Sequence, residues 1–78
     1  MSYSIAYSPA CERARLSLPA DKRRDLDNGM ARIAQDPYGC GSSATYHKDR
    51  REATCGSVIV VYQVTNNSLL VTVVELMG

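Results

Sequence analysis

The segment from Thr45 to Glu52 carries side chains that could do chemistry on a phosphate. His47 is the only histidine and could act as an acid or a base near neutral pH. An aromatic ring that stacks on a base and cations that follow the backbone are typical of RNA sites. The residues of this segment that could serve in that way are Tyr46, Lys48 and Arg51.

The same segment also fits a solvated edge strand, whose charged side chains discourage pairing with other chains. In a strand, Arg50 and Glu52 would share one face and Arg51 would point to the other. His47 alone also fits an exposed loop residue. Both interpretations, an RNA site and a solvated strand, remain open from the residues alone.

The charge distribution is uneven along the chain. All nine lysines and arginines lie within 13–51, and Glu75 is the only charge within 53–78. A formal net charge of +1 argues against a nonspecific nucleic-acid coat. Several cations fall in segments that we expect to be helical and fit a solvated helix face: Arg13, Arg15, Lys22, Arg23 and Arg24. Arg23 and Arg24 are also candidates for contact with RNA phosphates.

Length and composition indicate a small soluble protein. Seventy-eight residues support one domain, which we expect to span 1–78. Three cysteines without a C-x-x-C pair, and a single histidine, predict reduced thiols rather than a zinc site or a disulfide scaffold. The N-terminus lacks the regions of a signal peptide, and no apolar stretch is long enough to span a membrane. We therefore expect a cytoplasmic protein with no cofactor and no membrane partner.

Two helices are expected in the first half of the chain. Alternating residues over 3–7 predict a strand, after which Ser8-Pro9 fits a helix N-terminus. That helix runs from Ala10 to about Leu18, and a second from about Ala20 to Gln35. Gly29 falls on the apolar stripe of the second helix, which predicts close packing of its backbone against the sheet or the first helix. The other members of this stripe are Leu26, Met30 and Ile33.

The second half of the chain is expected to form strands. A Gly/Ser-rich connector over 38–43 precedes the polar segment, which continues into a strand at 53–55. The β-branched run 58–64 predicts a central strand covered on both faces, with Tyr62 in the core and its hydroxyl satisfied. A turn at 65–68 leads to a last strand over 69–76.

These elements predict an α+β fold in the order β-α-α-β-β-β. We expect a mainly antiparallel, four-stranded sheet with both helices packed on one face, because consecutive strands are joined by short turns.

The order of elements and several short anchors resemble the RelE/ParE superfamily, the toxins of type II toxin–antitoxin systems. The likeness covers almost the whole chain. The anchors are Tyr7-Ser8-Pro9, Leu18-Pro19, Asp36-Pro37, Arg50-Arg51 and Val60-Val61-Tyr62-Gln63-Val64.

The resemblance implies a cognate antitoxin as partner and a metal-independent activity. RelE-like members cut messenger RNA in the ribosome, with the RNA 2′-hydroxyl as nucleophile. Arg50 and Glu52 then fall at the two RNA-facing positions of the strand before the hairpin, so that Arg50, Glu52 and His47 would be phosphate clamp, base and acid.

The sequence departs from the RelE-like pattern in two places. Most RelE-like ribonucleases have an arginine where this chain has Ile59, and they commonly continue into a tail that carries further catalytic residues, which are missing after Glu75. We therefore expect an mRNA endonuclease with an incomplete catalytic set. The alternatives are a ParE-like inhibitor of DNA gyrase and a noncatalytic module that binds an antitoxin.

Overall fold

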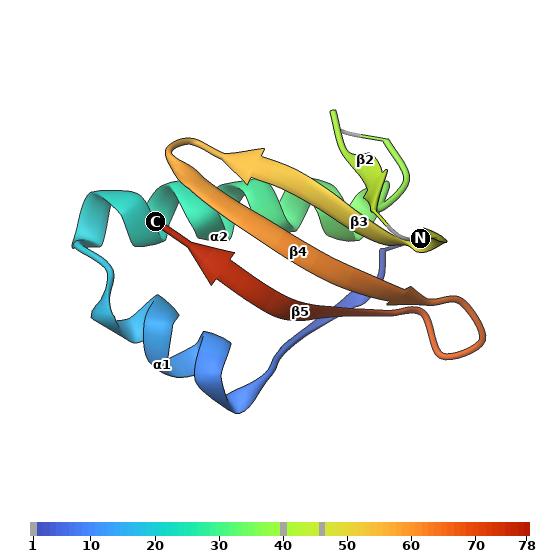
Figure 1. The fold of residues 1–78 in the computed structure, drawn as a ribbon, viewed down its shortest axis with the longest axis horizontal. Coiled ribbons are helices and arrows are strands. Elements are labelled where there is room, and N and C mark those ends of the chain that lie inside the picture. Colours follow the sequence, from blue (N-terminus) through green and yellow to red (C-terminus); the bar gives the residue numbers. More distant parts are fainter. Residues whose placement is uncertain (1, 40, 46) are drawn as a thin grey trace.

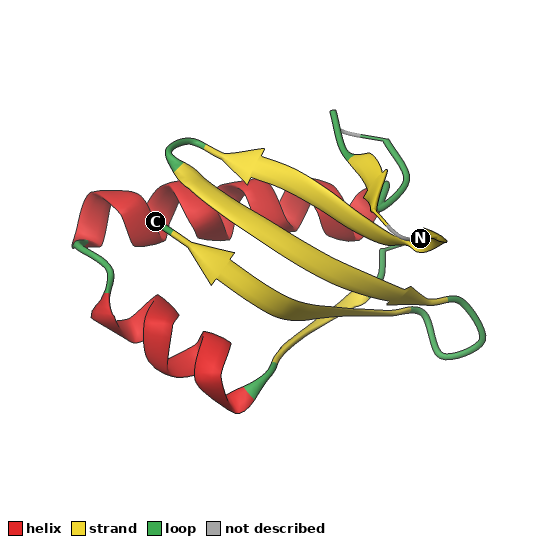
Figure 2. Cartoon of the chain, in the orientation of Figure 1, coloured by secondary structure: helices red, strands yellow, loops and turns green. Residues whose placement is uncertain are grey.

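The computed structural model describes residues 2–39, 41–45 and 47–78 and shows two helices and five strands (Figure 2). In chain order the elements are β1 (Ser4–Tyr7), α1 (Pro9–Ser17), α2 (Ala20–Gln35), β2 (Ser43–Thr45), β3 (His47–Cys55), β4 (Val58–Thr65) and β5 (Leu70–Met77).

The strands form one sheet in the order β1-β5-β4-β3-β2. The neighbours β2–β3, β3–β4 and β4–β5 are antiparallel, and β1 is parallel to β5. The α+β class and the mainly antiparallel sheet are confirmed. The prediction of four strands is corrected to five, because Ser43–Thr45, where the expected connector meets the polar segment, pairs with β3 as the short edge strand β2.

Both helices begin and end where the sequence indicates. The Ser8 side chain accepts a hydrogen bond from the Cys11 backbone N–H at 3.2 Å, and Pro9 occupies the first turn of α1. Pro19 separates the helices, and Asp36 ends α2 just before a proline.

The core lies between the two helices and one face of the sheet. In Figure 1, α2 passes behind the strands, and no helix of the described residues lies over the other face of the sheet. We call this uncovered side the bare face. The core cluster is formed by Cys11, Leu26, Met30, Ile33, Ala53, Cys55, Val58, Val60, Tyr62, Val64, Val71 and Val73.

The central strand β4 shows which side of the sheet is covered. Val58, Val60 and Val64 belong to the core cluster, whereas Ile59 and Gln63 are only partly buried on the bare face. The prediction that this strand is covered on both faces is therefore wrong, since both helices pack on one side.

Tyr62 is completely buried, and its hydroxyl donates to the Pro37 carbonyl at 2.6 Å. This arrangement confirms the prediction of a core tyrosine with a satisfied hydroxyl.

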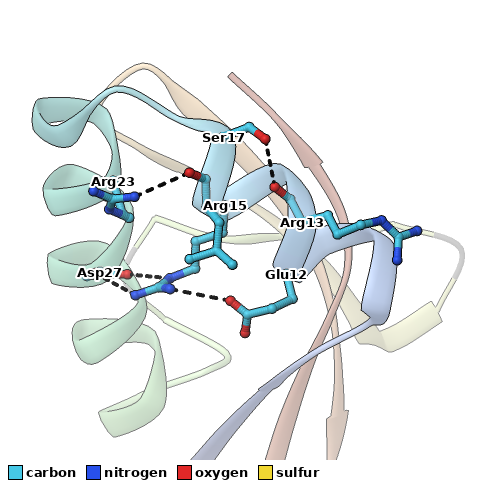
Figure 3. Close-up of polar contacts among 7 residues, drawn as sticks. Glu12, Arg13, Arg15, Ser17, Arg23 and Asp27 are labelled. Atoms are coloured by element: carbon cyan, nitrogen blue, oxygen red, sulfur yellow. Dashed lines mark hydrogen bonds and ion pairs between the residues drawn. The ribbon is translucent and has the colours of Figure 1, made fainter.

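Arg15 ties α1 to α2 instead of belonging to a solvated helix face as expected (Figure 3). Its Nε and Nη2 donate to the two carboxylate oxygens of Asp27, both at 3.0 Å, and Nη1 donates to Glu12 at 3.4 Å. The guanidinium carbon also lies 5.7 Å from the centroid of the Tyr7 ring on β1. A planar guanidinium with two parallel hydrogen bonds thus fixes the helices relative to each other and to β1.

The surroundings of Tyr7 make the stability of the fold sensitive to alkaline pH. Burial, followed by the nearby charge of Asp27, raises the pKa of Tyr7 to about 12 from an ordinary value of 10.0. Between these two values the unfolded chain releases the proton more readily than the folded one. We therefore expect the free energy of unfolding to fall as pH rises through this window, as measured by chemical denaturation followed by circular dichroism.

The matched variant Tyr7→Phe keeps the ring and removes the titrating hydroxyl. Its free energy of unfolding should fall less over the same pH interval than that of the unchanged protein. An equally steep fall in the variant would contradict the assignment to Tyr7.

Candidate functional site

The strand β3 places Arg50 and Glu52 on the bare face, as the alternation of the sequence predicts. Ala53 and Cys55 of the same strand point into the core. Because side chains alternate along a strand, Arg50 and Glu52 point away from the helices. Arg50 is partly buried and Glu52 is exposed. A cation and a carboxylate therefore lie next to each other, two residues apart along one strand.

The register brings a second carboxylate to this face. Glu52 is opposite Val61 on β4, and Val61 is opposite Glu75 on β5, so these three side chains form one row across the sheet. Arg50 stands in the next row, opposite Gln63. Glu75 was not among the residues that sequence analysis selected, although it is the only charge in the last third of the chain.

Arg50 and Glu75 form an ion pair across the central strand. The Nη2 of Arg50 lies 3.3 Å from Oε2 of Glu75, and 29% and 56% of the two side chains are exposed. Because β4 lies between β3 and β5, this pair crosses over β4. Val61, in the same row, is only 6% exposed although it lies outside the core cluster. The site thus combines one guanidinium with two carboxylates around a covered valine.

Arg51 points to the opposite face, as the alternation predicts, and binds the chain that follows α2. Its Nε donates to Ser42 Oγ at 2.8 Å, its Nη2 donates to the Ser42 carbonyl at 3.2 Å, and its guanidinium carbon lies 5.5 Å from the centroid of the Tyr38 ring. The structure therefore gives Arg51 a role in holding this segment against β3, and separates it from Arg50.

A polar network joins the start of β3 to the turn between β4 and β5. The Tyr38 hydroxyl donates to Asp49 at 2.6 Å and accepts from the Asn66 amide at 2.9 Å, while the Tyr3 hydroxyl donates to the Asn66 carbonyl oxygen at 2.7 Å. Burial, followed by the hydrogen bond to Asp49, raises the pKa of Tyr38. This network fixes the strand on which the candidate residues lie.

The remaining candidates of the polar segment are placed less completely. Tyr46 lies outside the described residues. His47 and Lys48 lie in β3, and His47 pairs with Thr45 of β2, but their side chains lie outside the described part.

The helical candidates lie apart from the bare face. Arg23 and Arg24 are on α2, on the side of the sheet opposite to Arg50. Arg23 donates to the Leu16 carbonyl at 3.4 Å and so helps to join the two helices (Figure 3), and Arg24 is exposed. The structure therefore does not bring these two cations together with Arg50 and Glu52.

Other chemistry has little support in the described part of the chain. Burial raises the pKa of the Cys55 thiol, which disfavours the thiolate needed for nucleophilic attack. No three His, Cys, Asp or Glu side chains of residues 2–39, 41–45 and 47–78 gather as metal ligands would. No helix within these ranges is long and apolar enough to cross a membrane.

Comparison with solved structures shows that this α+β arrangement is the fold of the RelE toxins. The isolated RelE toxin of E. coli superposes with a TM-score of 0.85 over 96% of this chain and 82% of that chain, at 17% sequence identity. For the RelBE2 toxin–antitoxin complex of Mycobacterium tuberculosis the TM-score is 0.84, over 100% of this chain and 92% of that chain, at 12% sequence identity. For the RelE–RelB complex of Pyrococcus horikoshii the TM-score is 0.80, over 100% of this chain and 96% of that chain, at 18% sequence identity. The sequence matches no family model and no curated protein.

Proposed function

We propose that this chain is the toxin component of a type II toxin–antitoxin system and that it cuts messenger RNA on the ribosome. The fold supports the first part, since similar chains are RelE toxins solved alone or with RelB antitoxins. The observation that carries the second part is the placement of Arg50 beside Glu52 on the bare face of the sheet. A cognate antitoxin is the proposed protein partner.

The proposed chemistry needs a group that takes a proton and a cation that stabilises the phosphate. Glu52 would accept the proton of the RNA 2′-hydroxyl, which then attacks the adjacent phosphorus atom. Arg50 would donate hydrogen bonds to the phosphate oxygens, on which negative charge develops in the transition state. His47 is the proposed acid for the leaving oxygen, because an imidazolium can donate a proton near neutral pH. Tyr46 and Lys48 are proposed to contact the RNA beside this site.

One observation favours a second candidate, a noncatalytic module that binds an antitoxin. Ile59 is opposite Thr54 and Met77, so it lies on the bare face. The resemblance to RelE-like ribonucleases, most of which have an arginine at this point of the pattern, leads us to expect a cation there. An apolar side chain there supplies no charge to a phosphate, and Glu75 adds a negative charge nearby.

An assay in a translating extract distinguishes an RNA-cleaving toxin from a noncatalytic protein. The purified protein, added with a reporter message, should produce cuts that depend on translation and that primer extension maps to positions within codons. Intact message at a large molar excess of protein would overturn the RNA-cleaving function. In that case a supercoiling assay with DNA gyrase distinguishes a gyrase inhibitor, which would stop supercoiling, from a module that only binds an antitoxin.

A further inference from the structure

Glu75 stands where it can compete with RNA for Arg50. Its carboxylate contacts the guanidinium at 3.3 Å across β4, on the same face as Glu52. A phosphodiester and a carboxylate each carry one negative charge and each accept hydrogen bonds from a guanidinium. A phosphate that binds Arg50 must therefore displace Glu75 or lie against its charge.

The contact between Arg50 and Glu75 is of a kind that a ligand can displace. The clamp between Arg15 and Asp27 has two hydrogen bonds of 3.0 Å, whereas the Arg50 contact is longer and 56% of the Glu75 side chain is exposed. Exposed ion pairs contribute little free energy because water and salt screen them. The pair thus orients Arg50 over the sheet without holding it permanently.

We propose that Glu75 is a specificity-determining residue that competes with the RNA phosphate for Arg50 and weakens the affinity of the free toxin for RNA. This inference rests on the proposed function. A ligand that brings only one phosphate gains little by displacing Glu75, whereas RNA positioned by further contacts can do so, because those contacts offset the loss of the ion pair.

The variant Glu75→Gln tests the proposal because it removes the charge and keeps the shape. We expect it to bind a short fluorescein-labelled single-stranded RNA about two- to fivefold more tightly at low salt, since removal of one exposed negative charge beside the bound phosphate has an effect of this order. The gain should shrink as salt is added. Fluorescence anisotropy measures the dissociation constants.

Asp21→Asn is the matched control, because it makes the same change in net charge on an exposed side chain of α2, on the other side of the sheet. The double variant Arg50→Ala/Glu75→Gln tests whether Glu75 acts through Arg50. If it does, Glu75→Gln does not increase the affinity for RNA when Arg50 is already replaced by alanine.

Two results would overturn the proposal, and they are distinguishable. If Arg50→Ala weakens RNA binding but Glu75→Gln binds no more tightly than Asp21→Asn, the competition is absent and the proposed phosphate site stands. If Arg50→Ala leaves RNA binding unchanged, the phosphate site and the competition both fail.

Discussion

If the chain cuts messenger RNA as proposed, replacement of Arg50 by alanine is expected to slow cleavage strongly. Arg50 lies on the bare face beside Glu52, and the proposed transition state would place additional negative charge on the phosphate oxygens. Loss of one such preorganised donor typically lowers a rate by a factor of about 10²–10³. Cleavage of a reporter message in a translating extract, followed over time, measures this rate.

Arg51→Ala is the matched control for Arg50→Ala, because the neighbouring arginine points to the opposite face and binds Ser42 and Tyr38. It should lower the thermal midpoint by loss of these contacts while the folded molecules still cut the message. Arg50→Lys, which keeps the charge but not the planar fork, should retain part of the rate. Cleavage by Arg50→Ala at the unchanged rate would remove Arg50 from the proposed mechanism.

Replacement of Gly29 by alanine is expected to be strongly destabilising. A β-carbon at this position would collide with the sulfur of Cys55 and would lie 2.6 Å from its β-carbon and 3.3 Å from its α-carbon. The two carbons belong to the backbone of β3 and the base of a side chain, so a change of rotamer cannot move them away. Overpacking of this kind costs about 1–3 kcal/mol, while the better helix propensity of alanine returns up to about 1 kcal/mol.

We expect a net loss of about 1–2 kcal/mol, which for a domain of this size lowers the thermal midpoint by about 4–16 °C. Differential scanning calorimetry measures it. Asn28→Ala, at the exposed neighbouring position, is the control and should not destabilise the protein. In the Cys55→Ala background, where the sulfur is absent, the cost of Gly29→Ala should be smaller. A midpoint for Gly29→Ala at or above that of the unchanged protein would contradict close packing of α2 on β3.

Features with a local cause could be predicted from the sequence. The start of α1 follows from a serine cap and a proline that fits the first turn, and the break between the helices follows from Pro19. The placement of Arg50 and Glu52 on one face follows from the two-residue period of a strand. Gly29 on an apolar stripe indicated a close approach, and the structure shows that the partner is the sheet.

Features that depend on pairing between distant segments could not be predicted in this way. The parallel partner of β1 is β5, and the edge strand β2 is short and polar, so neither has a signal in a local window. Arg15 was expected in solvent, but the packing of α1 beside α2 brings Asp27 of the second helix within 3.0 Å of it. The contact between Arg50 and Glu75 depends on the register of three strands over a separation of 25 residues.

The sequence by itself determined the order of the elements other than β2, the helix boundaries and the face of β3 that carries the candidate cation and carboxylate. These depend on backbone preferences and on the period of apolar residues, which act over a few positions. Only the tertiary structure decided which strands are neighbours, that the helices leave one face bare, and that the lone acidic residue of the last strand lies against Arg50. The parallel pairing of β1 with β5 and the bulge that shifts the register of β4 against β5 have no local signature, because they depend on how the whole sheet packs on its core.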